Sequence, residues 1–414
     1  MPRWWAGVDW SNGLQDVGIV DEQGRMVRHL RIPETPAGVD EMLSALRALN
    51  PTSHRFSRKQ VPVAIEDSGR LIVAELRRRQ QPVIHIPPAV ASRHRGRTAV
   101  ATSKSDRTDA ALLANIIRRD PGRFRLLPDN SDSAAAVTVL ARAQKDAAIR
   151  AAEMAVRLQA HLRLYFPAAV QAWAGMEHGL RRGEARAVLA LAATPRAAAA
   201  LSKPRLYDAL AAGGRTRLLD DHAARLRDLF GTPQLRHRPL TEEAMGIRTL
   251  SLLSELDNAC QVNERLEVLA LDAFSRHPHS AVYRTFPGLK SVLGARVFAE
   301  IGDDPDRFTN ARALRSYAGT APLTWASGDT QVVTHRRVAN RRLKVAVHSW
   351  AFTSLNRSPG CRALYDRRRE HGDRYAAALR HVGGRLLAGL HHCIQTGTVF
   401  SETAMFPHAT TPTQ

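Results

Sequence analysis

The segment WWAGVDW, residues 4–10, opens the chain with a short apolar run that carries one carboxylate, Asp9, near its end. Asn12-Gly13 follows as a turn signal, and two further strand-like runs occupy residues 17–20 and 26–32. Short apolar runs separated by tight polar turns are typical of consecutive antiparallel strands. We therefore predict that the chain begins with three antiparallel strands.

Helices and strands alternate after this opening. Apolar residues recur at helical spacing over 34–49, 71–79 and 106–119, and residues 61–65 and 82–86 are typical of short buried strands. This order is that of a ribonuclease H-like fold, whereas doubly wound nucleotide-binding folds begin with βαβ. No GxGxxG follows the first strand. We assign residues 1–127 to an α/β domain of the ribonuclease H-like class.

The composition changes near Pro128, and residues 128–278 are predicted to be helical. Two stretches, 133–163 and 241–274, are rich in Ala, Arg, Leu and Glu and exceed the usual length of a globular helix. They predict an antiparallel, coiled-coil-like arm, or alternatively an ordinary helical bundle. Shorter helices are expected over 175–235.

Residues 279–400 are predicted to form a mainly helical C-terminal domain. Phe286-Pro287-Gly288-Leu289 before a helix resembles a helix-hairpin-helix turn, in which glycine lets backbone N–H groups approach a phosphate. Residues 319–330 are expected to be a loop and 401–414 a disordered tail. The predicted helices cover 291–301, 311–318, 338–356, 359–371 and 374–396.

Positive charge indicates a polyanionic partner. Lys and Arg number 60 against 39 Asp and Glu, a formal net charge of +21. Such an excess favours binding to phosphate backbones, and the cations are clustered rather than evenly spread. We predict nucleic-acid contacts at Arg93, Arg95, Arg97, Lys104, Gly288, Lys290, Arg336, Arg337, Arg341, Arg342 and Lys344.

Several protein classes are excluded by what the sequence lacks. The three cysteines include no CxxC pair, and there is no apolar run of about 18 residues and no secretory leader. Metalloprotease and nucleotide-binding motifs, HExxH and GxxxxGK[ST], are also missing. We expect a protein of a reducing, cytoplasmic compartment.

Four carboxylates occupy related positions in the predicted first domain. Asp9 ends the first strand and Glu66 the fourth, and these strands are neighbours in a ribonuclease H-like sheet. Asp106 and Asp109, spaced i,i+3, share one face of a helix start. Singly, each is explained by a turn, an arginine partner or a helix cap. Together they favour a site for Mg²⁺ or Mn²⁺, which prefer carboxylate oxygens and can activate an attacking oxygen in phosphodiester chemistry.

The motifs occur in a specific order along the chain. Residues 7–9 (GVD), 64–69 (AIEDSG) and 104–110 (KSDRTDA) resemble the DEDD transposase domain of the insertion-sequence 110 family, a RuvC-like relative of Holliday-junction resolvases. The resemblance covers residues 5–125 and 280–398, and its C-terminal part includes 286–289 (FPGL), 306–308 (DRF), 313–319 (ALRSYAG) and 322–328 (PLTWASG).

This resemblance implies a transposase with two catalytic parts. Asp9, Glu66, Asp106 and Asp109 would coordinate Mg²⁺, and Ser327 would be the nucleophile that forms a phosphoserine link with DNA. The family resemblance also implies a homodimer or homotetramer that acts on donor and target DNA with a structured non-coding guide (bridge) RNA. It further implies a location in the bacterial cytoplasm, associated with the nucleoid. Guide pairing would explain why the sequence contains no helix-turn-helix or zinc-finger motif.

The chain departs from the family pattern at two points. Asp67 stands where a small residue is common and competes with Glu66 for the metal role, and residues 287–290 read PGLK rather than PGIG. Two alternatives remain open. One is a metal-dependent nuclease or resolvase that uses water, with Ser327 a loop hydroxyl. The other is a non-catalytic nucleic-acid-binding protein.

Overall fold

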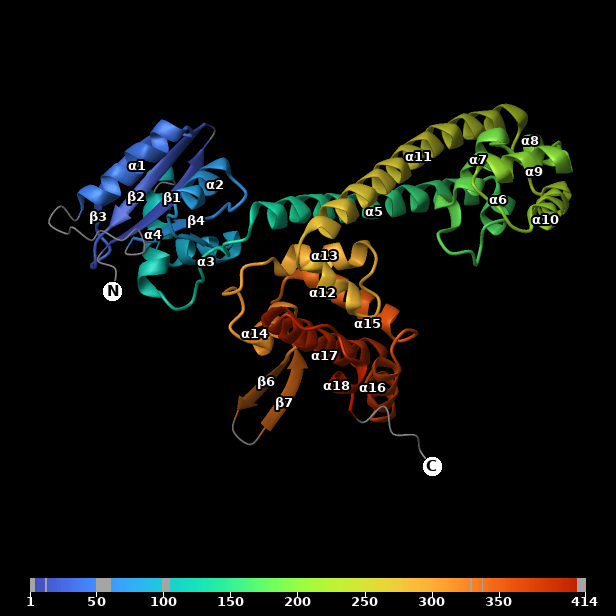
Figure 1. Ribbon diagram of the computed structural model, residues 1–414. Coiled ribbons are helices and arrows are strands. Elements are labelled where there is room, and N and C mark those ends of the chain that lie inside the picture. Colours follow the sequence, from blue (N-terminus) through green and yellow to red (C-terminus); the bar gives the residue numbers. More distant parts are fainter. Residues whose placement is uncertain are drawn as a thin grey trace. The chain divides into compact units, whose positions relative to one another are not determined.

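The computed structural model describes residues 4–11, 13–49, 61–98, 105–327, 330–336 and 338–407. The chain folds into two compact units, residues 1–129 and 130–414 (Figure 1). The first is a mixed α/β unit and the second is mostly helical. None of the described helices combines the length and apolar character that a bilayer crossing needs.

A five-stranded sheet forms the centre of the first unit. Its strand order is β3-β2-β1-β4-β5, in which the first three strands are antiparallel and β4 and β5 run parallel to β1. The strands expected from the sequence are therefore confirmed. Their bounds are β1 Trp5–Ser11, β2 Leu14–Val20, β3 Met26–Pro33, β4 Val63–Ile65 and β5 Val83–His85.

The two faces of the sheet carry different helices. Alternate residues of β1 point to opposite faces, so that Ala6 and Val8 join a core with α1 (Pro36–Ala48) and α2 (Leu71–Arg78). Trp5 instead joins the core on the side of α4 (Asp106–Arg119). A further helix, α3 (Pro88–Thr98), was not predicted, because its Arg-rich sequence has no apolar period; among residues 88–95, whose burial is described, only Ala91 is fully buried.

The second unit begins with a pair of long antiparallel helices (Figure 1). Helices α5 (Asp132–Arg163) and α11 (Pro239–Arg276) are aligned by hydrogen bonds from Gln144 to Asn263 and between His161 and the carbonyl of Met245. This antiparallel pair occupies the region for which the sequence suggested either an arm or an ordinary bundle. Shorter helices join the far ends of the pair, namely α6 (Pro167–Gln171), α7 (Gly183–Leu191), α8 (Pro195–Ala199), α9 (Lys203–Ala212) and α10 (Leu219–Gly231).

The C-terminal helices pack around Trp350, Phe286 and Phe298. Ala134, Val137 and Ala141 at the start of α5 belong to the same core, which explains why 130–414 is one unit rather than an arm and a separate domain. The helices are α12 (Ser280–Thr285), α13 (Val292–Ile301), α14 (Ala311–Tyr317), α15 (Arg341–Ser354), α16 (Pro359–Glu370), α17 (Tyr375–Thr396) and α18 (Glu402–Met405).

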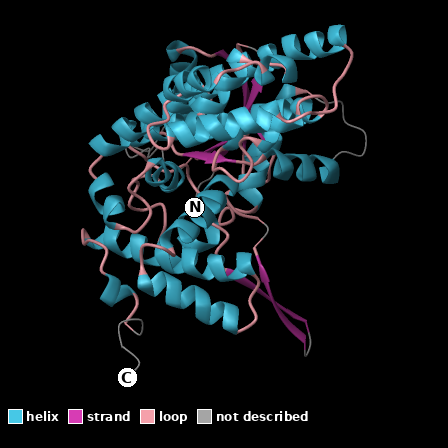
Figure 2. Cartoon of the chain, turned by 90° about the vertical axis from the view of Figure 1, so that its right-hand side faces the viewer, coloured by secondary structure: helices cyan, strands magenta, loops and turns pink. Residues whose placement is uncertain are grey.

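Two expectations for this unit are wrong. Residues 319–330 were expected to be a loop, but β6 (Pro322–Ser327) and β7 (Thr330–His335) pair as an antiparallel hairpin (Figure 2). The β-branched and aromatic residues of these segments favour strands. The expected disordered tail 401–414 is also ordered in its first part, because α18 and Phe406 pack into the core; residues 408–414 lie outside the described chain.

Candidate active site

Glycines let α4 lie directly on the sheet beside Asp9. A Cβ at Gly7 would be 2.1 Å from the carbonyl oxygen of Ala110, and one at Gly18 would be 2.8 Å from the backbone nitrogen of Ala111. Asp9 is two residues beyond Gly7 in β1, so its side chain leaves the same face of the sheet. The close approach therefore brings the start of α4 to Asp9.

A capping box fixes where α4 begins. The Ser105 hydroxyl accepts a hydrogen bond from the Thr108 backbone N–H, and the Thr108 hydroxyl accepts one from the Ser105 N–H. This start makes Asp106 the first helical residue and places Asp109 one turn later. Asp106 is exposed, whereas Asp109 is buried, with a relative exposure of 6%.

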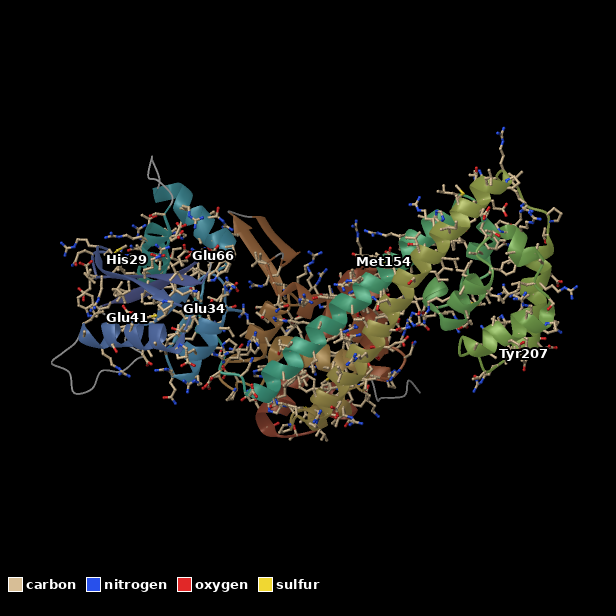
Figure 3. The ribbon with its side chains drawn as sticks, turned by 90° about the horizontal axis from the view of Figure 1, so that it is seen from above. His29, Glu34, Glu41, Glu66, Met154 and Tyr207 are labelled. Atoms are coloured by element: carbon tan, nitrogen blue, oxygen red, sulfur yellow. The ribbon has the colours of Figure 1, made fainter. Side chains whose placement is uncertain are left out.

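Glu66 reaches the same sheet edge from β4. The parallel register pairs Val8 with Ile65, so Asp9 and Glu66 are the next residues of two adjacent strands. Glu66 is half-buried in the first unit (Figure 3). The juxtaposition expected from the sequence is therefore present in the fold.

The electrostatics of Asp9 show that the other three carboxylates act on it. Burial raises its pKa from 3.8 to about 6, with further increases from the negative charges of Asp109, Asp106 and Glu66. The hydrogen bond with the Trp10 backbone lowers the pKa in part. A cation placed here would relieve this repulsion.

Asp67 takes no part in this cluster. Its Oδ1 accepts a hydrogen bond from the Gly69 N–H at 3.0 Å, and its Oδ2 lies 3.5 Å from Nε of Arg70. Its charge is not among the causes that raise the pKa of Asp9, whereas that of Glu66 is. The geometry therefore favours Glu66 over Asp67 as the fourth carboxylate.

The carboxylate oxygens of the site are of the type that binds a divalent cation, but the side chains are not gathered closely enough to coordinate one. Within the described ranges, no three His, Cys, Asp or Glu side chains are near enough to hold a metal as they stand. Asp109 instead accepts a hydrogen bond from Nε of Arg95 at 2.9 Å. The Arg95 side chain is thus bonded to an oxygen of Asp109, one of the carboxylates that would bind a metal cation.

Ser327 is the last residue of β6 and pairs with Thr330 across the hairpin. Its side chain, like Gly328 beside it, lies outside the described part of the structure. All four carboxylates belong to residues 1–129 and Ser327 belongs to residues 130–414. The backbone thus assigns Ser327 to a hairpin end rather than to the irregular loop that the sequence suggested.

Comparison with known proteins identifies the chain. Residues 6–167 match a family model described as a transposase, of the IS110 type with a DEDD motif, and residues 280–366 match that of the transposase IS116/IS110/IS902 family. The chain is 45% identical over 401 residues to the mini-circle IS117 protein of Streptomyces coelicolor, covering 97% of this chain and 96% of the relative. The chain belongs to the IS110 family of transposases.

Other insertion-element proteins are more distant. The IS110 43.6 kDa protein of Streptomyces coelicolor is 28% identical over 76% of both chains. The IS900 42 kDa protein of Mycobacterium paratuberculosis is 26% identical over 96% of both. The protein is therefore a transposase for the mobility of an insertion element, an enzyme that acts on DNA.

The basic residues that we predicted to contact nucleic acid differ in exposure and in bonding partners. In α3, Arg93 is exposed and Arg95 binds Asp109, while the Arg97 side chain and Lys104 lie outside the described part. Arg95 also lines a pocket of about 330 Å³ with His94, Arg107 and Asp109. The sequence contained no signal for the Arg95–Asp109 pair, because the two residues are 14 positions apart on different helices.

The predicted contacts of the second unit differ in exposure. Arg341 is exposed, Arg336 and Lys344 are half-buried, and Arg337 is outside the described residues. Arg342 forms a two-bond ion pair with Asp146, with N–O distances of 2.9 and 3.0 Å. That carboxylate therefore neutralises one of the predicted cations.

The Pro287-Gly288 turn of the transposase has a packing reason for its glycine. Gly288 has φ +88° and is buried, and a Cβ there would be 2.7 Å from the Thr353 hydroxyl. Trp350 Nε1 donates to the Pro287 carbonyl at 2.9 Å. Lys290 is exposed just beyond the turn, so a phosphate contact there would involve Lys290 more readily than Gly288.

Proposed function

We propose that this transposase cleaves and exchanges DNA strands through Ser327, with a divalent cation held by Asp9, Glu66, Asp106 and Asp109. The observation that carries the proposal is the effect of Asp109, Asp106 and Glu66 on the pKa of Asp9, together with the adjacent strand ends of Asp9 and Glu66 at one edge of the sheet. The strand order β3-β2-β1-β4-β5 supports a ribonuclease H or RuvC-like fold for this unit. Mg²⁺ or Mn²⁺ bound there would stabilise charge on the attacking and leaving oxygens.

The Ser327 hydroxyl attacks the phosphorus of a DNA phosphodiester. A bond forms between Oγ and phosphorus, the bond to one deoxyribose oxygen breaks, and that oxygen leaves with a proton. The number of phosphodiester bonds is unchanged, so a second deoxyribose hydroxyl can reverse the reaction and complete strand exchange. Arg336, Arg337 and Arg341 are cations near the hairpin in sequence that would stabilise the developing negative charge.

Sequence recognition is assigned to a structured non-coding guide RNA that pairs with DNA. The support is the net charge of +21 together with the family resemblance. Two or more protomers assemble, because strand exchange joins two DNA partners.

Ser327→Ala tests the chemistry. The variant should lose recombination and the covalent protein–DNA adduct that denaturing electrophoresis detects with labelled DNA, while DNA binding by fluorescence anisotropy is retained. The control is Ser251→Ala, an exposed serine of α11. Recombination and adduct at wild-type rates in Ser327→Ala would end the serine role.

The competing function is metal-dependent cleavage by water. It is favoured by the location of all four carboxylates within residues 1–129, which fold as a unit without Ser327. Cleaved ends that form without any adduct, at the same rate in wild type and Ser327→Ala, would establish this alternative. Salt-sensitive binding without any cleavage in Mg²⁺ would indicate a non-catalytic protein.

A further inference from the structure

A pocket of about 450 Å³ lies between α5, α13 and α15 in the second unit. This volume is within the range of about 300–1,000 Å³ that small-ligand sites occupy. Its charged lining consists of five cations and two carboxylates, Arg142, Lys145, Arg296, Arg341, Arg342, Asp146 and Glu300. The pocket lies in one compact unit, so its walls are defined by that unit alone.

Both carboxylates are already neutralised. Glu300 is buried and receives two hydrogen bonds of 2.8 Å from Arg142, and Asp146 receives the two from Arg342. Among the described residues, no carboxylate is within ion-pair distance of the other three cations, Lys145, Arg296 and Arg341. The lining therefore carries an excess of positive charge, which Asp146 and Glu267 offset only from a greater distance at Lys145 and Arg296.

Burial disfavours the charged forms of Lys145 and Arg296. Burial lowers the pKa of Arg296, whose Nε donates to Oε1 of Gln144 at 2.8 Å rather than to a carboxylate. Burial and the nearby charges of Arg296 and Arg342 lower the pKa of Lys145, and the charge of Asp146 opposes this in part. A ligand with negative charge would relieve both effects.

Apart from Ser349, the rest of the lining is apolar. Leu293, Ala299 and Ala346 are buried, and Ile149 and Val345 are 43% and 45% exposed at the edge. Cations beside an apolar surface suit an amphipathic anion better than a free inorganic ion. An unpaired nucleotide has this character, because its phosphate is charged and its sugar edge and base are largely apolar.

We propose that this pocket binds one unpaired nucleotide of the nucleic acids on which the transposase acts, with the phosphate at Lys145, Arg296 and Arg341 and the sugar and base against Ile149 and Val345. The proposal does not depend on the Ser327 chemistry. Lys145, Ile149 and Arg296 were absent from the contacts expected from the sequence, because Lys145 and Ile149 lie on α5 and Arg296 lies on α13, with no shared motif.

Cysteine protection tests occupancy directly. Ser349 is exposed and lines the pocket, and all three native cysteines are buried, so Ser349→Cys supplies a single accessible thiol. The full chain is alkylated with and without saturating single-stranded DNA or RNA of one sequence, with binding followed by anisotropy in the same samples. Ser251→Cys on α11 is the matched control.

We expect bound single strands to slow alkylation at position 349 at least fivefold and to leave position 251 unchanged. Whether DNA, RNA or both protect identifies the source of the nucleotide. An unchanged rate at 349 with every bound single strand, or protection by full duplex alone, would overturn the proposal. Protection that rises with protein concentration and not with nucleic acid would also overturn it, since a second copy would then cover the pocket.

A charge variant supplies the second measurement. Lys145→Met should abolish protection at 349 and reduce the slope of log affinity against log salt for single strands by about 0.7, the value for one lost phosphate contact. Arg157→Met removes one exposed cation elsewhere on α5 and should leave the protection intact. Equal protection in both variants would contradict the assignment of Lys145.

Discussion

Nε of Arg95 lies 2.9 Å from Oδ1 of Asp109, so a side chain of α3 holds one carboxylate of the candidate metal site. The pair gives Asp109 a positive partner in the absence of any ion. It also means that a divalent cation and the guanidinium compete for the same oxygen. One residue of the basic cluster that we predicted to contact nucleic acid, Arg95, therefore binds directly to the acidic site.

Removal of this competitor should strengthen metal binding. We expect Arg95→Met to lower the Mg²⁺ concentration for half-maximal DNA cleavage by roughly threefold to fivefold, matching the about 0.7–1 kcal/mol of a partly exposed ion pair. Arg93→Met, an exposed neighbour on α3, is the control for lost charge. A Mg²⁺ requirement that rises in Arg95→Met, or that shifts equally in both variants, would contradict competition.

The raised pKa of Asp9 predicts a pH-dependent stability effect. An acid whose pKa is about 6 when folded and near 3.8 when unfolded destabilises the fold above pH 6, and this penalty disappears as pH falls toward 3.8. Asp9→Asn should therefore raise the Tm of the metal-free protein by a few degrees at pH 7 and by nothing near pH 4.

Thermal unfolding from pH 4 to 8, with and without Mg²⁺, measures this effect. Added Mg²⁺ should raise the Tm of the wild type and remove the Tm difference between it and Asp9→Asn at pH 7. The variant should lose DNA cleavage and keep salt-sensitive DNA binding. Asp16→Asn and Asp67→Asn are unsuitable as controls because Asp16 pairs with His29 and Asp67 pairs with Arg70, so Glu41→Gln, at an exposed position of α1, is used. A Tm difference that persists unchanged at pH 4 would show that the carboxylate charge is not its cause.

Much of this architecture follows from local sequence patterns. The apolar runs of β1 and β2, the long periodic stretches of α5 and α11, and the order of the four acids are all visible along the chain. The Arg95–Asp109 pair and the pocket between α5, α13 and α15 cannot be recognised along the chain, because their residues come together only through helix packing. The hairpin β6–β7 was missed because Gly, Pro and Ser outweighed its β-branched residues in the sequence interpretation.

The contact between β1 and α4 predicts that Gly7 cannot be replaced. Gly7→Ala would put a methyl group 2.1 Å from the Ala110 carbonyl oxygen, forcing α4 and both of its acids away from Asp9. We expect a loss of about 1–3 kcal/mol in the free energy of unfolding, as for other overpacked cores, together with loss of DNA cleavage. Gly122→Ala, which has open space around its Cβ, should unfold like the wild type in urea. Wild-type stability and cleavage in Gly7→Ala would refute the close packing.

Glu300 connects the arm to the C-terminal helices through hydrogen bonds from two polar side chains. Its carboxylate is 3% exposed and accepts hydrogen bonds from Arg142 of α5 and from Nδ2 of Asn340 at 2.8 Å. Asn340 in turn caps α15 through the Leu343 N–H at 2.8 Å. These bonds hold the pKa of Glu300 below its usual range, against the burial that raises it.

Loss of this carboxylate should weaken the second unit. Glu300→Gln leaves Arg142 without its charged partner, and we expect a loss of about 3 kcal/mol in the free energy of unfolding at pH 7. Because the folded pKa is lowered, the stabilisation by Glu300 is present above pH 4.5 and is lost as pH falls below it, so the difference between wild type and variant should shrink in acid. Urea unfolding of Glu300→Gln and of Glu264→Gln, an exposed glutamate of α11, measures both effects. Equal stability of the two variants at pH 7 would mean that the buried ion pair does not hold the arm to the helices that follow it.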